Sequence, residues 1–365
     1  MSIRNLKAFG LGSLLLMAFG CSAEAGENFE SQESQSTQQA IVVSPQKLHV
    51  VGVTSSGGLR HALRTGTSWS GFGDVEGQAG DIGTVTDAQA EISLGGLHVI
   101  AIAGGALFHT IRSETSWQPF VNMAVPLGTV GTYNSVALAN GTAGTHVCVT
   151  TTAGGLFHTI RSSTSWQPWG DVKLASNSNP GSLKRVACSV HSVVVGQVPA
   201  PPGGISLPIF GDELHVVALT TSGVPYHAIR HPNGSWDTLN NVNVPTGNTT
   251  PFSDIDIDVD PNGELHVVGT GSNLQYHSFR TSGGWSVFGD IEQPAGDPGN
   301  QQSGAAVALD EGLYVFDQLS NGGLMMTRRG SGAWDAFMDV RVATGSTESF
   351  KKVSTAGESA VIGPN

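Results

Sequence analysis

Three side chains that could bind a ligand recur together along the sequence: a histidine, an arginine and a tryptophan. In its fullest form the segment reads LFHTIRSxTSWQP, at 107–119 and again at 156–168. An imidazole can donate and accept hydrogen bonds, a guanidinium is a rigid fork of donors, and an indole offers a flat apolar surface for stacking. Because a catalytic group is needed once and this set recurs, its chemistry is that of binding at several places.

The tryptophans mark the period of the repeat. They stand 48, 49, 70, 49 and 49 residues apart, at Trp69, Trp117, Trp166, Trp236, Trp285 and Trp334. A fixed period of this size is typical of a repeat architecture, in which every unit adopts the same local structure.

Each unit divides into four short segments with the composition of β-strands. In the third unit they are 135–139, 146–151, 156–161 and 166–172, separated by Gly, Asn, Ser or Thr. β-Branched and aromatic residues favour strands, and no segment shows a sustained helical period, so we expect no helix beyond the N-terminus. Four antiparallel strands in about 40 to 50 residues are typical of a propeller blade. The sequence therefore predicts an all-β fold, a single β-propeller of four-stranded antiparallel blades.

Alternation along the third segment divides the recurring set between two faces. His158 shares a face with Leu156 and Ile160, whereas Arg161 lies on the other face. Arg161 ends its strand, a four-residue turn follows, and Trp166 opens the next strand. The arginine and the tryptophan should therefore be neighbours across a hairpin, close enough to stack.

The sequence indicates the number of blades less directly than it indicates the structure of each blade. Six complete units run from Ala40 to about Gly345, and the tail has the pattern of two more strands, at 352–354 and 360–362. Either six blades close the ring and the tail decorates it, or the tail belongs to an incomplete seventh blade. We favour six blades.

The repeated unit GGLxHxxRxxxxWxxFGDV resembles the repeat of bacterial propeller lectins of the PLL type, which bind fucose and O-methylated sugars. It is also loosely similar to tectonin and to fungal fucose-lectin propellers. The resemblance covers nearly all of residues 40–345, although PLL-type lectins have seven blades and their symmetry does not transfer directly. It implies several shallow carbohydrate sites between adjacent blades, each with an aromatic platform and a few polar side chains.

The resemblance assigns candidate carbohydrate-binding residues by their position in each unit. A pyranose has an apolar C–H face that stacks on indole, and its hydroxyls need fixed donors and acceptors. In the sixth unit Met326 replaces the histidine while Arg329 and Trp334 stay, so we expect a sixth site to be dead or altered. The matching residues are His61, Arg64 and Trp69; His109, Arg112 and Trp117; His158, Arg161 and Trp166; His227, Arg230 and Trp236; and His277, Arg280 and Trp285.

Each recurring residue also has a purely structural interpretation. The tryptophan could pack blade against blade, and the histidine is expected to be buried, bonded to backbone of the next blade. The arginine either contacts a ligand or stacks on the tryptophan. Four aspartates that recur after the tryptophan are expected to bond to local backbone; they are Asp74, Asp171, Asp290 and Asp339.

Motifs for metal binding and catalysis are weak. Asp258, Asp260 and Asn262 match the start of a calcium loop, but Gly269 stands where a bidentate Glu is needed, and Pro-Asn-Gly makes an ordinary hairpin turn. The sequence has no nucleophile elbow or phosphate loop. A propeller glycosidase needs a pair of acids in its central funnel, outside the repeat pattern. We expect no enzymatic activity, no metal and no cofactor.

The N-terminal region has the features of an export signal. Arg4 and Lys7 precede an apolar stretch within residues 1–20, and Cys21 follows as in a bacterial lipobox, which the preceding Ala-Phe-Gly matches imperfectly. Ala23-Glu-Ala25 would instead serve ordinary signal peptidase. We favour lipidation of Cys21, a flexible Ser/Gln/Glu-rich linker to residue 39 and a propeller over 40–365, in the bacterial cell envelope or secreted.

Two further features concern the cysteines and the long gap. Cys148 and Cys188 could pair in an oxidising compartment, but we expect isolated buried thiols. A Pro/Gly-rich insertion at about 191–212 explains the 70-residue gap. We expect a surface loop there, which either covers a site or reflects a turn that tolerates insertion.

These observations predict an exported, multivalent carbohydrate-binding protein, a lectin that recognises fucosylated or O-methylated glycans between its blades. The net charge of −12 argues against nucleic acid and against an anionic membrane as partner, so membrane contact is expected only through a lipid anchor. The main alternative is a cell-surface propeller that binds proteins without sugar; the other is a glycosidase or lyase. The sequence does not fix the oligomeric state.

Overall fold

The computed structural model describes residues 41–44, 46–163, 165–199, 205–358 and 361–364. The chain divides into a small unit, Met1–Ile41 with Pro364–Asn365, and a large unit, Val42–Gly363, that holds all the blades. The expected export signal, Cys21 and the linker lie outside the described residues. Among the helices of the described ranges, none has the length and apolar character to cross a membrane.

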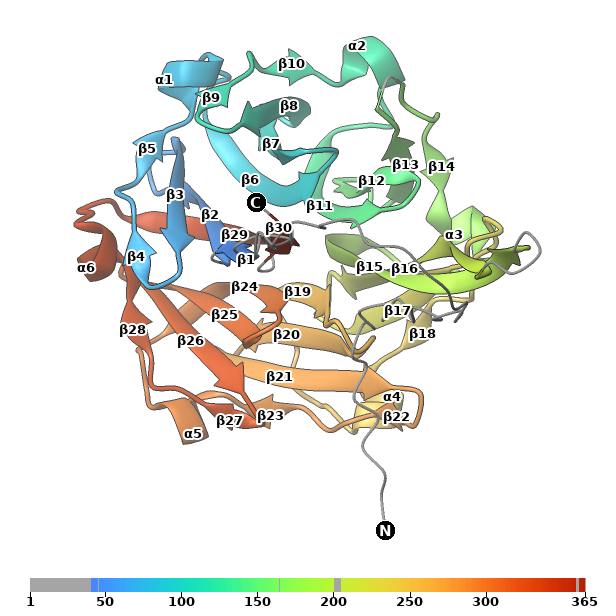
Figure 1. Cartoon of the computed structure of the whole chain (residues 1–365). Helices are drawn as coiled ribbons and strands as arrows, with labels where there is room; N and C mark the ends of the chain where they lie inside the picture. Colours follow the sequence, from blue (N-terminus) through green and yellow to red (C-terminus); the bar gives the residue numbers. More distant parts are fainter. Residues whose placement is uncertain (1–40, 45, 164, 200–204, 359–360, 365) are drawn as a thin grey trace, which may run out of the picture. The chain divides into compact units, whose positions relative to one another are not determined.

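Six antiparallel sheets form the blades (Figure 1), and the predicted six-bladed β-propeller is confirmed. Blade 1 contains β29 (Phe350–Glu358), β2 (Lys47–Thr54), β3 (Leu59–Thr65), β4 (Ser68–Trp69) and β5 (Gly73–Asp74). Blade 2 contains β6 (Val85–Ser93), β7 (Gly96–Ala103), β8 (Ala106–Ser113), β9 (Ser116–Trp117) and β10 (Val121–Asn122). Blade 3 contains β11 (Tyr133–Gly141), β12 (Gly144–Thr151), β13 (Leu156–Arg161) and β14 (Gly170–Asp171).

The other three blades follow the same plan. Blade 4 contains β15 (Leu183–Val198), β16 (Leu207–Thr220), β17 (Pro225–Arg230) and β18 (Asn240–Asn241). Blade 5 contains β19 (Asp254–Val259), β20 (Leu265–Gly271), β21 (Leu274–Thr281), β22 (Gly284–Trp285) and β23 (Gly289–Asp290). Blade 6 contains β24 (Gln301–Leu309), β25 (Gly312–Leu319), β26 (Leu324–Gly330), β27 (Ala333–Trp334) and β28 (Met338–Asp339). A separate two-stranded sheet pairs β1 (Ile41–Ser44) with β30 (Val361–Pro364).

The first strand of each blade lies at the centre of the ring. The strands β29, β6, β11, β15, β19 and β24 contact one another in a closed series, and the later strands of each blade lead outward. The fourth strand is short and in most blades is split, with the tryptophan in or beside its first piece and the recurrent aspartate in its second.

The C-terminal tail closes the ring instead of decorating it. The strand β29 pairs along the whole of β2 and so supplies the inner strand of blade 1, with Val51 opposite Ser354. The expectation of a complete first unit was therefore wrong, because that unit has only its three outer strands. Phe350, at the start of β29, is 1% exposed and packs against Phe72 with ring centroids 4.8 Å apart.

Six helices of one turn follow the fourth strands, where we expected none. They are α1 (Glu76–Ala79), α2 (Ala124–Leu127), α3 (Val172–Ala175), α4 (Asn243–Thr246), α5 (Glu292–Ala295) and α6 (Val340–Thr344). A single turn is too short to show a 3.6-residue apolar period, so pattern analysis does not detect it. The recurrent aspartates bond to backbone here as predicted; Asp171 accepts from the Leu174 N–H at 3.1 Å and Asp339 from the Arg341 N–H at 2.8 Å.

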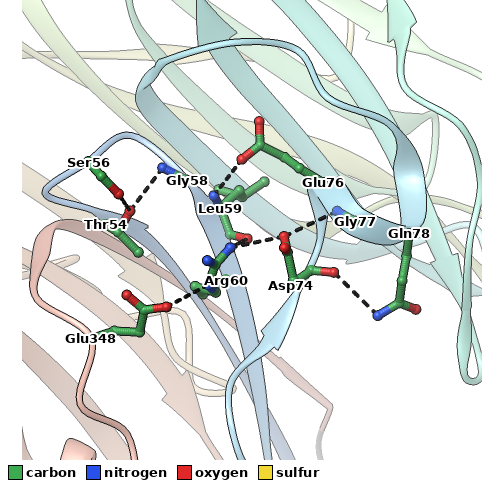
Figure 2. Close-up of polar contacts among 10 residues, drawn as sticks. All are labelled: Thr54, Ser56, Gly58, Leu59, Arg60, Asp74, Glu76, Gly77, Gln78 and Glu348. Atoms are coloured by element: carbon green, nitrogen blue, oxygen red, sulfur yellow. Dashed lines mark hydrogen bonds and ion pairs between the residues drawn. The ribbon is translucent and has the colours of Figure 1, made fainter.

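Figure 2 shows how the first of these aspartates also helps to hold the closed ring. The Oδ1 atom of Asp74 accepts from the Gly77 N–H at 3.1 Å and from Arg60 Nη1 at 2.9 Å. Arg60 Nε donates to Glu348 Oε1, also at 2.9 Å, just before β29 begins. One guanidinium therefore links blade 1 to the segment that completes it.

The hydrophobic core lies between the blades. Six clusters of buried residues each combine side chains of two neighbouring blades, and in each the tryptophan of the second blade packs at the edge. A blade cannot cover its own faces, so this stacking of neighbours stabilises the ring. Of the two interpretations of the tryptophans, packing between blades is observed.

One sequence expectation for blade 4 is corrected and another is confirmed. The insertion is not an irregular loop, because β15 and β16 continue as a paired hairpin from His191 opposite Glu213 to Val198 opposite Leu207. Cys148 and Cys188 are free, buried thiols as expected, and both belong to the core cluster between blades 3 and 4. Burial and a hydrogen bond with Cys148 raise the pKa of the Cys188 thiol.

Candidate functional site

Each recurrent histidine is bonded to a second histidine on the neighbouring strand of its own blade. In blade 1, Nδ1 of His49 lies 2.9 Å from Nε2 of His61. The same bond, at 3.0 to 3.1 Å, joins the pairs His98–His109, His146–His158, His215–His227 and His266–His277. The expected bond to backbone of the next blade is thus replaced by a bond within the blade.

The second histidines went unnoticed in the sequence, although a signal was present. They occur 11 or 12 residues before the predicted histidines, in a repeated His-Val step that in four units reads Leu-His-Val. Blade 6 has Leu313-Tyr314-Val315 at this position and Met326 at the other, so both histidines are replaced together. That joint replacement indicates that the two residues form one unit.

Each histidine pair packs against the tryptophan of the next blade. The ring of His61 meets Trp117 edge-on, with centroids 5.5 Å apart and planes at 80°. The other four contacts span 5.4 to 5.8 Å and 77° to 89°; they are His109–Trp166, His158–Trp236, His227–Trp285 and His277–Trp334. The structure therefore regroups the predicted sets, because a histidine meets the tryptophan that follows one blade later.

The arginine and tryptophan of one blade are cross-strand neighbours, as predicted. The register pairs Arg112 with Trp117 and Arg280 with Trp285, and isolated bridges join Arg161 to Trp166 and Arg230 to Trp236. The guanidinium of Arg161 lies over the Trp166 ring, 5.9 Å from its centroid.

We define a gap by the two blades that border it. Gap 1/2 then contains His49 and His61 of blade 1 with Arg112 and Trp117 of blade 2, and gaps 2/3, 3/4, 4/5 and 5/6 repeat this combination. A cavity of about 570 Å³ in gap 1/2 is lined by His49, Arg112, Glu114 and Glu358. Gap 5/6 holds a cavity of about 470 Å³, lined by His266 and Arg329 in the equivalent positions.

The members of this set differ in their access to a ligand. The five predicted histidines are only 7 to 8% exposed, whereas the arginines and tryptophans are half-buried. Among the described residues no carboxylate forms an ion pair with Arg112, Arg161 or Arg230, and burial lowers the pKa of all three. Guanidinium groups that are partly desolvated and unpaired are suited to donate hydrogen bonds to oxygens of a ligand.

Burial keeps several of the paired histidines neutral. Burial is the main cause that lowers the pKa of His61, His109 and His215 to about 3, and that of His98 and His266 to about 4. Repulsion by the arginine of the next blade lowers several of these pKa values further. At neutral pH these five histidines are therefore uncharged and do not repel the neighbouring guanidinium groups.

Gap 6/1 is the altered one. It combines Tyr314 and Met326 of blade 6 with Arg64 and Trp69 of blade 1. Here Arg64 Nη1 donates to the Tyr314 hydroxyl at 3.2 Å, so the arginine is already engaged by protein. We expected Arg329 and Trp334 to belong to the altered site, but they complete the intact gap 5/6 instead.

Carboxylates also lie at the ring axis, which is where a propeller glycosidase has its pair of acids. Burial raises the pKa of Asp256 to about 7 and of Asp258 to about 6. Both are held by blade 6, since Asp256 accepts from the Ala306 N–H at 2.9 Å and Asp258 from the Ala308 N–H at 2.7 Å. The cavity there, of about 70 Å³, is far smaller than the roughly 300 Å³ or more of ligand pockets. The aspartates at the axis therefore join blades 5 and 6.

No protein-family model and no curated protein sequence matches this chain. Solved structures do match. The fucose-specific lectin from Aleuria aurantia has a TM-score of 0.55 at 14% identity, over 81% of this chain and 95% of that one. The chain has the six-bladed fold of that lectin.

Two further structures of the A. aurantia lectin agree. A variant in complex with α-methyl-L-fucoside has a TM-score of 0.55 at 14% identity, over 85% of this chain and 100% of that chain. Another, described as a six-bladed β-propeller with a novel fucose recognition mode, has a TM-score of 0.53 at 12% identity, over 82% and 94%. At such identities the likeness establishes the fold, and the specific resemblance to PLL-type repeats stays a prediction.

Proposed function

We propose that this protein is a multivalent carbohydrate-binding lectin whose sites lie in the gaps between blades. The observation that carries the proposal is the fivefold recurrence of a half-buried arginine beside a tryptophan, next to a buried histidine pair of the preceding blade. The fold shared with fucose-specific lectins supports it.

The set suits a neutral sugar better than a charged ligand. The indole provides an apolar surface for a C–H face of the ring, and the guanidinium provides donors to hydroxyl oxygens. In gap 1/2, Glu114 and Glu358 line the same cavity and can accept from hydroxyls. Each site has one platform and two or three hydrogen bonds, so we expect dissociation constants of roughly 0.1 to 1 mM per site and tighter binding to multivalent glycans.

Fucosylated or O-methylated glycans are the ligands we propose. The A. aurantia lectin is described as fucose-specific and was crystallised with fucosides, and the repeat itself resembles that of lectins for O-methylated sugars. A methyl group at C6 of fucose or on a methylated oxygen adds apolar area to stack on indole. We further propose export, with Cys21 as the lipid-anchored residue.

A glycan array with the purified chain from residue 27 tests the proposal, with free L-fucose and 2-O-methyl-fucose as competitors. We expect binding to fucosylated or methylated glycans that the free sugars abolish. A folded protein that binds no glycan on the array would overturn the lectin assignment.

The hairpin of blade 4 favours a second candidate function, protein binding at a cell surface. Residues 193–211 carry no charged side chain. Seven of the fourteen exposed large hydrophobic residues in the described ranges lie there: Val194, Val195, Val198, Ile205, Leu207, Ile209 and Phe210. Exposed apolar clusters of this kind are typical of interaction surfaces.

This second function is tested by charge substitution. The double variant Ile209→Lys with Phe210→Lys should abolish capture of a protein partner by the immobilised chain, whereas Val244→Lys, at an exposed apolar residue of α4, should not. Glycan binding that survives the double variant would separate the two functions. Partner capture unaffected by the double variant would contradict a role for the hairpin.

A further inference from the structure

The turn between β19 and β20 brings three potential metal ligands together in gap 5/6. Asp260, Glu264 and His266 each have a donor atom within 4.8 Å of the donor atoms of the other two. Val259 pairs with Leu265, so Asp260 and Glu264 face each other across the turn, and His266 lies two residues further along the same face. The three residues therefore share one wall of the cavity between blades 5 and 6.

His266 is the member that indicates a ligand. It is 4% exposed, and its Nδ1 is bonded to Nε2 of His277 at 3.1 Å. Its other nitrogen, Nε2, has no hydrogen-bond partner within the described parts of the chain. In two other blades the comparable nitrogen lies beside a carboxylate: His49 Nε2 is 3.3 Å from Glu358, and His146 Nε2 is 3.4 Å from Asp212. Because His266 lines the cavity, this nitrogen can bind a ligand there, and a neutral imidazole nitrogen is a common metal ligand.

Hydrogen bonds within the protein hold the proposed ligands in place. The Oδ1 atom of Asp260 accepts from the N–H groups of Asn262 and Glu264 at 2.9 and 2.8 Å, and its Oδ2 accepts from Asn262 Nδ2 at 3.0 Å. His277 holds His266 in the same way: in the tautomer with the proton on His266 Nδ1, His277 Nε2 accepts it and the lone pair of His266 lies on Nε2. Outer contacts of this kind orient ligands in metal sites.

The local charge favours a cation. Besides Asp260 and Glu264, the cavity is lined by Asp310 and Glu311, against a single guanidinium, that of Arg329. Glu311 is also paired with Arg328, 3.6 Å away, so four carboxylates face two guanidinium groups, and the remaining negative charge would attract a divalent ion.

We propose that Asp260, Glu264 and His266 bind a divalent transition metal ion, Zn²⁺, with water in the remaining position. One imidazole nitrogen and two carboxylate oxygens are donors that Zn²⁺ accepts, and three protein ligands with one water are typical of an open zinc site. Ca²⁺ fits less well because it takes oxygen ligands. This cluster also differs from the calcium pattern of the sequence, because Asp258 points elsewhere and accepts from Ser189 Oγ at 2.7 Å. The expectation of no metal is the one that this proposal replaces.

Blade 1 provides a natural comparison. Lys47 and Glu358 occupy the positions of Glu264 and Asp260, before a histidine in the same register. Lys47 Nζ donates to Glu358 Oε2 at 3.0 Å, and His49 Nε2 meets Glu358 Oε1. There a lysine provides the positive charge that we assign to a metal ion in blade 5, so Glu264→Lys would copy the blade 1 arrangement.

The test is titration of the chelator-treated chain with ZnCl₂, followed by calorimetry and by the melting temperature. We expect one tight equivalent with a rise in melting temperature, and at least a tenfold weaker affinity in both Glu264→Gln and Glu264→Lys. Glu311→Gln, which changes an acid of the same cavity outside the cluster, should bind as the parent does. The unligated variants should melt as the unligated parent does, which excludes misfolding as the cause.

Two outcomes would overturn the proposal. One is a parent chain that binds no Zn²⁺ with an affinity better than millimolar. The other is binding that survives Glu264→Gln but is lost in His231→Gln, which would place the ion at the surface pair of His231 with Asp237, 2.9 Å apart. Because the readouts are metal affinity and melting temperature, the result is independent of whether the gaps bind sugar.

Discussion

Acid should destabilise this propeller through its histidine pairs, and one pair can be removed by copying blade 6. The double variant His98→Tyr with His109→Met reproduces the Tyr314 and Met326 combination in gap 2/3. The replaced side chains titrate near pH 6.5 in the unfolded chain, whereas the new ones do not titrate between pH 7 and 5.

The expected size follows from proton linkage. The folded chain lowers the pKa of His98 to about 4 and that of His109 to about 3, so near pH 5 the unfolded chain binds protons that the folded chain does not. Stability due to these groups is therefore complete above pH 6.5 and decreases as the pH falls through the window from 6.5 to 4. Between pH 7 and pH 5 each histidine should lower the free energy of unfolding by about 2 kcal/mol, hence about 4 kcal/mol for the pair.

Urea unfolding of both proteins at pH 7 and pH 5 measures this quantity. We expect the acid-induced loss of unfolding free energy to be smaller in the double variant by about 4 kcal/mol. His231→Gln is a suitable control, because the hydrogen bond to Asp237 raises the pKa of His231 and its acid dependence has the opposite sign. Since His231 is about a third exposed, that effect should be small. An acid-induced loss equal in parent and double variant would refute the assignment of neutral, buried pairs.

Three other predictions follow from the packing. Phe350→Ala should lower the free energy of unfolding by about 3 to 5 kcal/mol, because it leaves a cavity in the core where β29 completes blade 1. Val287→Ala, at a side chain that is 73% exposed, should change the free energy of unfolding little, so equal effects in chemical denaturation would contradict closure by β29. In the chain from residue 27, which lacks Cys21, the buried thiols of Cys148 and Cys188 should react with a thiol reagent only after unfolding, so rapid labelling of this native chain, followed by absorbance, would argue against their burial. Gly144→Ala should destabilise by at least about 1 kcal/mol, since Gly144 has a φ of +126° and a Cβ there would lie against the carbonyl oxygen of Arg161; an unchanged melting temperature would count against that turn.

The sequence predicted the fold and the pairing within a blade because both are local. Period, strand composition and turn residues reveal the blade, and the four-residue turn between Arg161 and Trp166 places them side by side. The one-turn helices were not predicted, because four or five residues are too few to show a periodic pattern.

The composition of each gap could not be read in the same way, because it depends on contacts between units. The repeat lists His61, Arg64 and Trp69 together, but stacking places His61 against Trp117 and Arg64 against Tyr314. The closure by β29 is of the same kind, since nothing local shows that a C-terminal strand belongs to the first blade. The second histidines recur visibly in the sequence, but only the structure shows that each is hydrogen-bonded to a first histidine.

The central claim is that the gaps with a histidine pair bind sugar and gap 6/1 does not. Titration with methyl α-L-fucoside, read as the number of occupied sites by native mass spectrometry, should count no more than five. Arg112→Ala should remove one site, whereas Arg64→Ala, in the gap where Tyr314 engages the arginine, should leave the count unchanged. A count that is the same in the parent and Arg112→Ala, or one that falls with Arg64→Ala alone, would contradict the account.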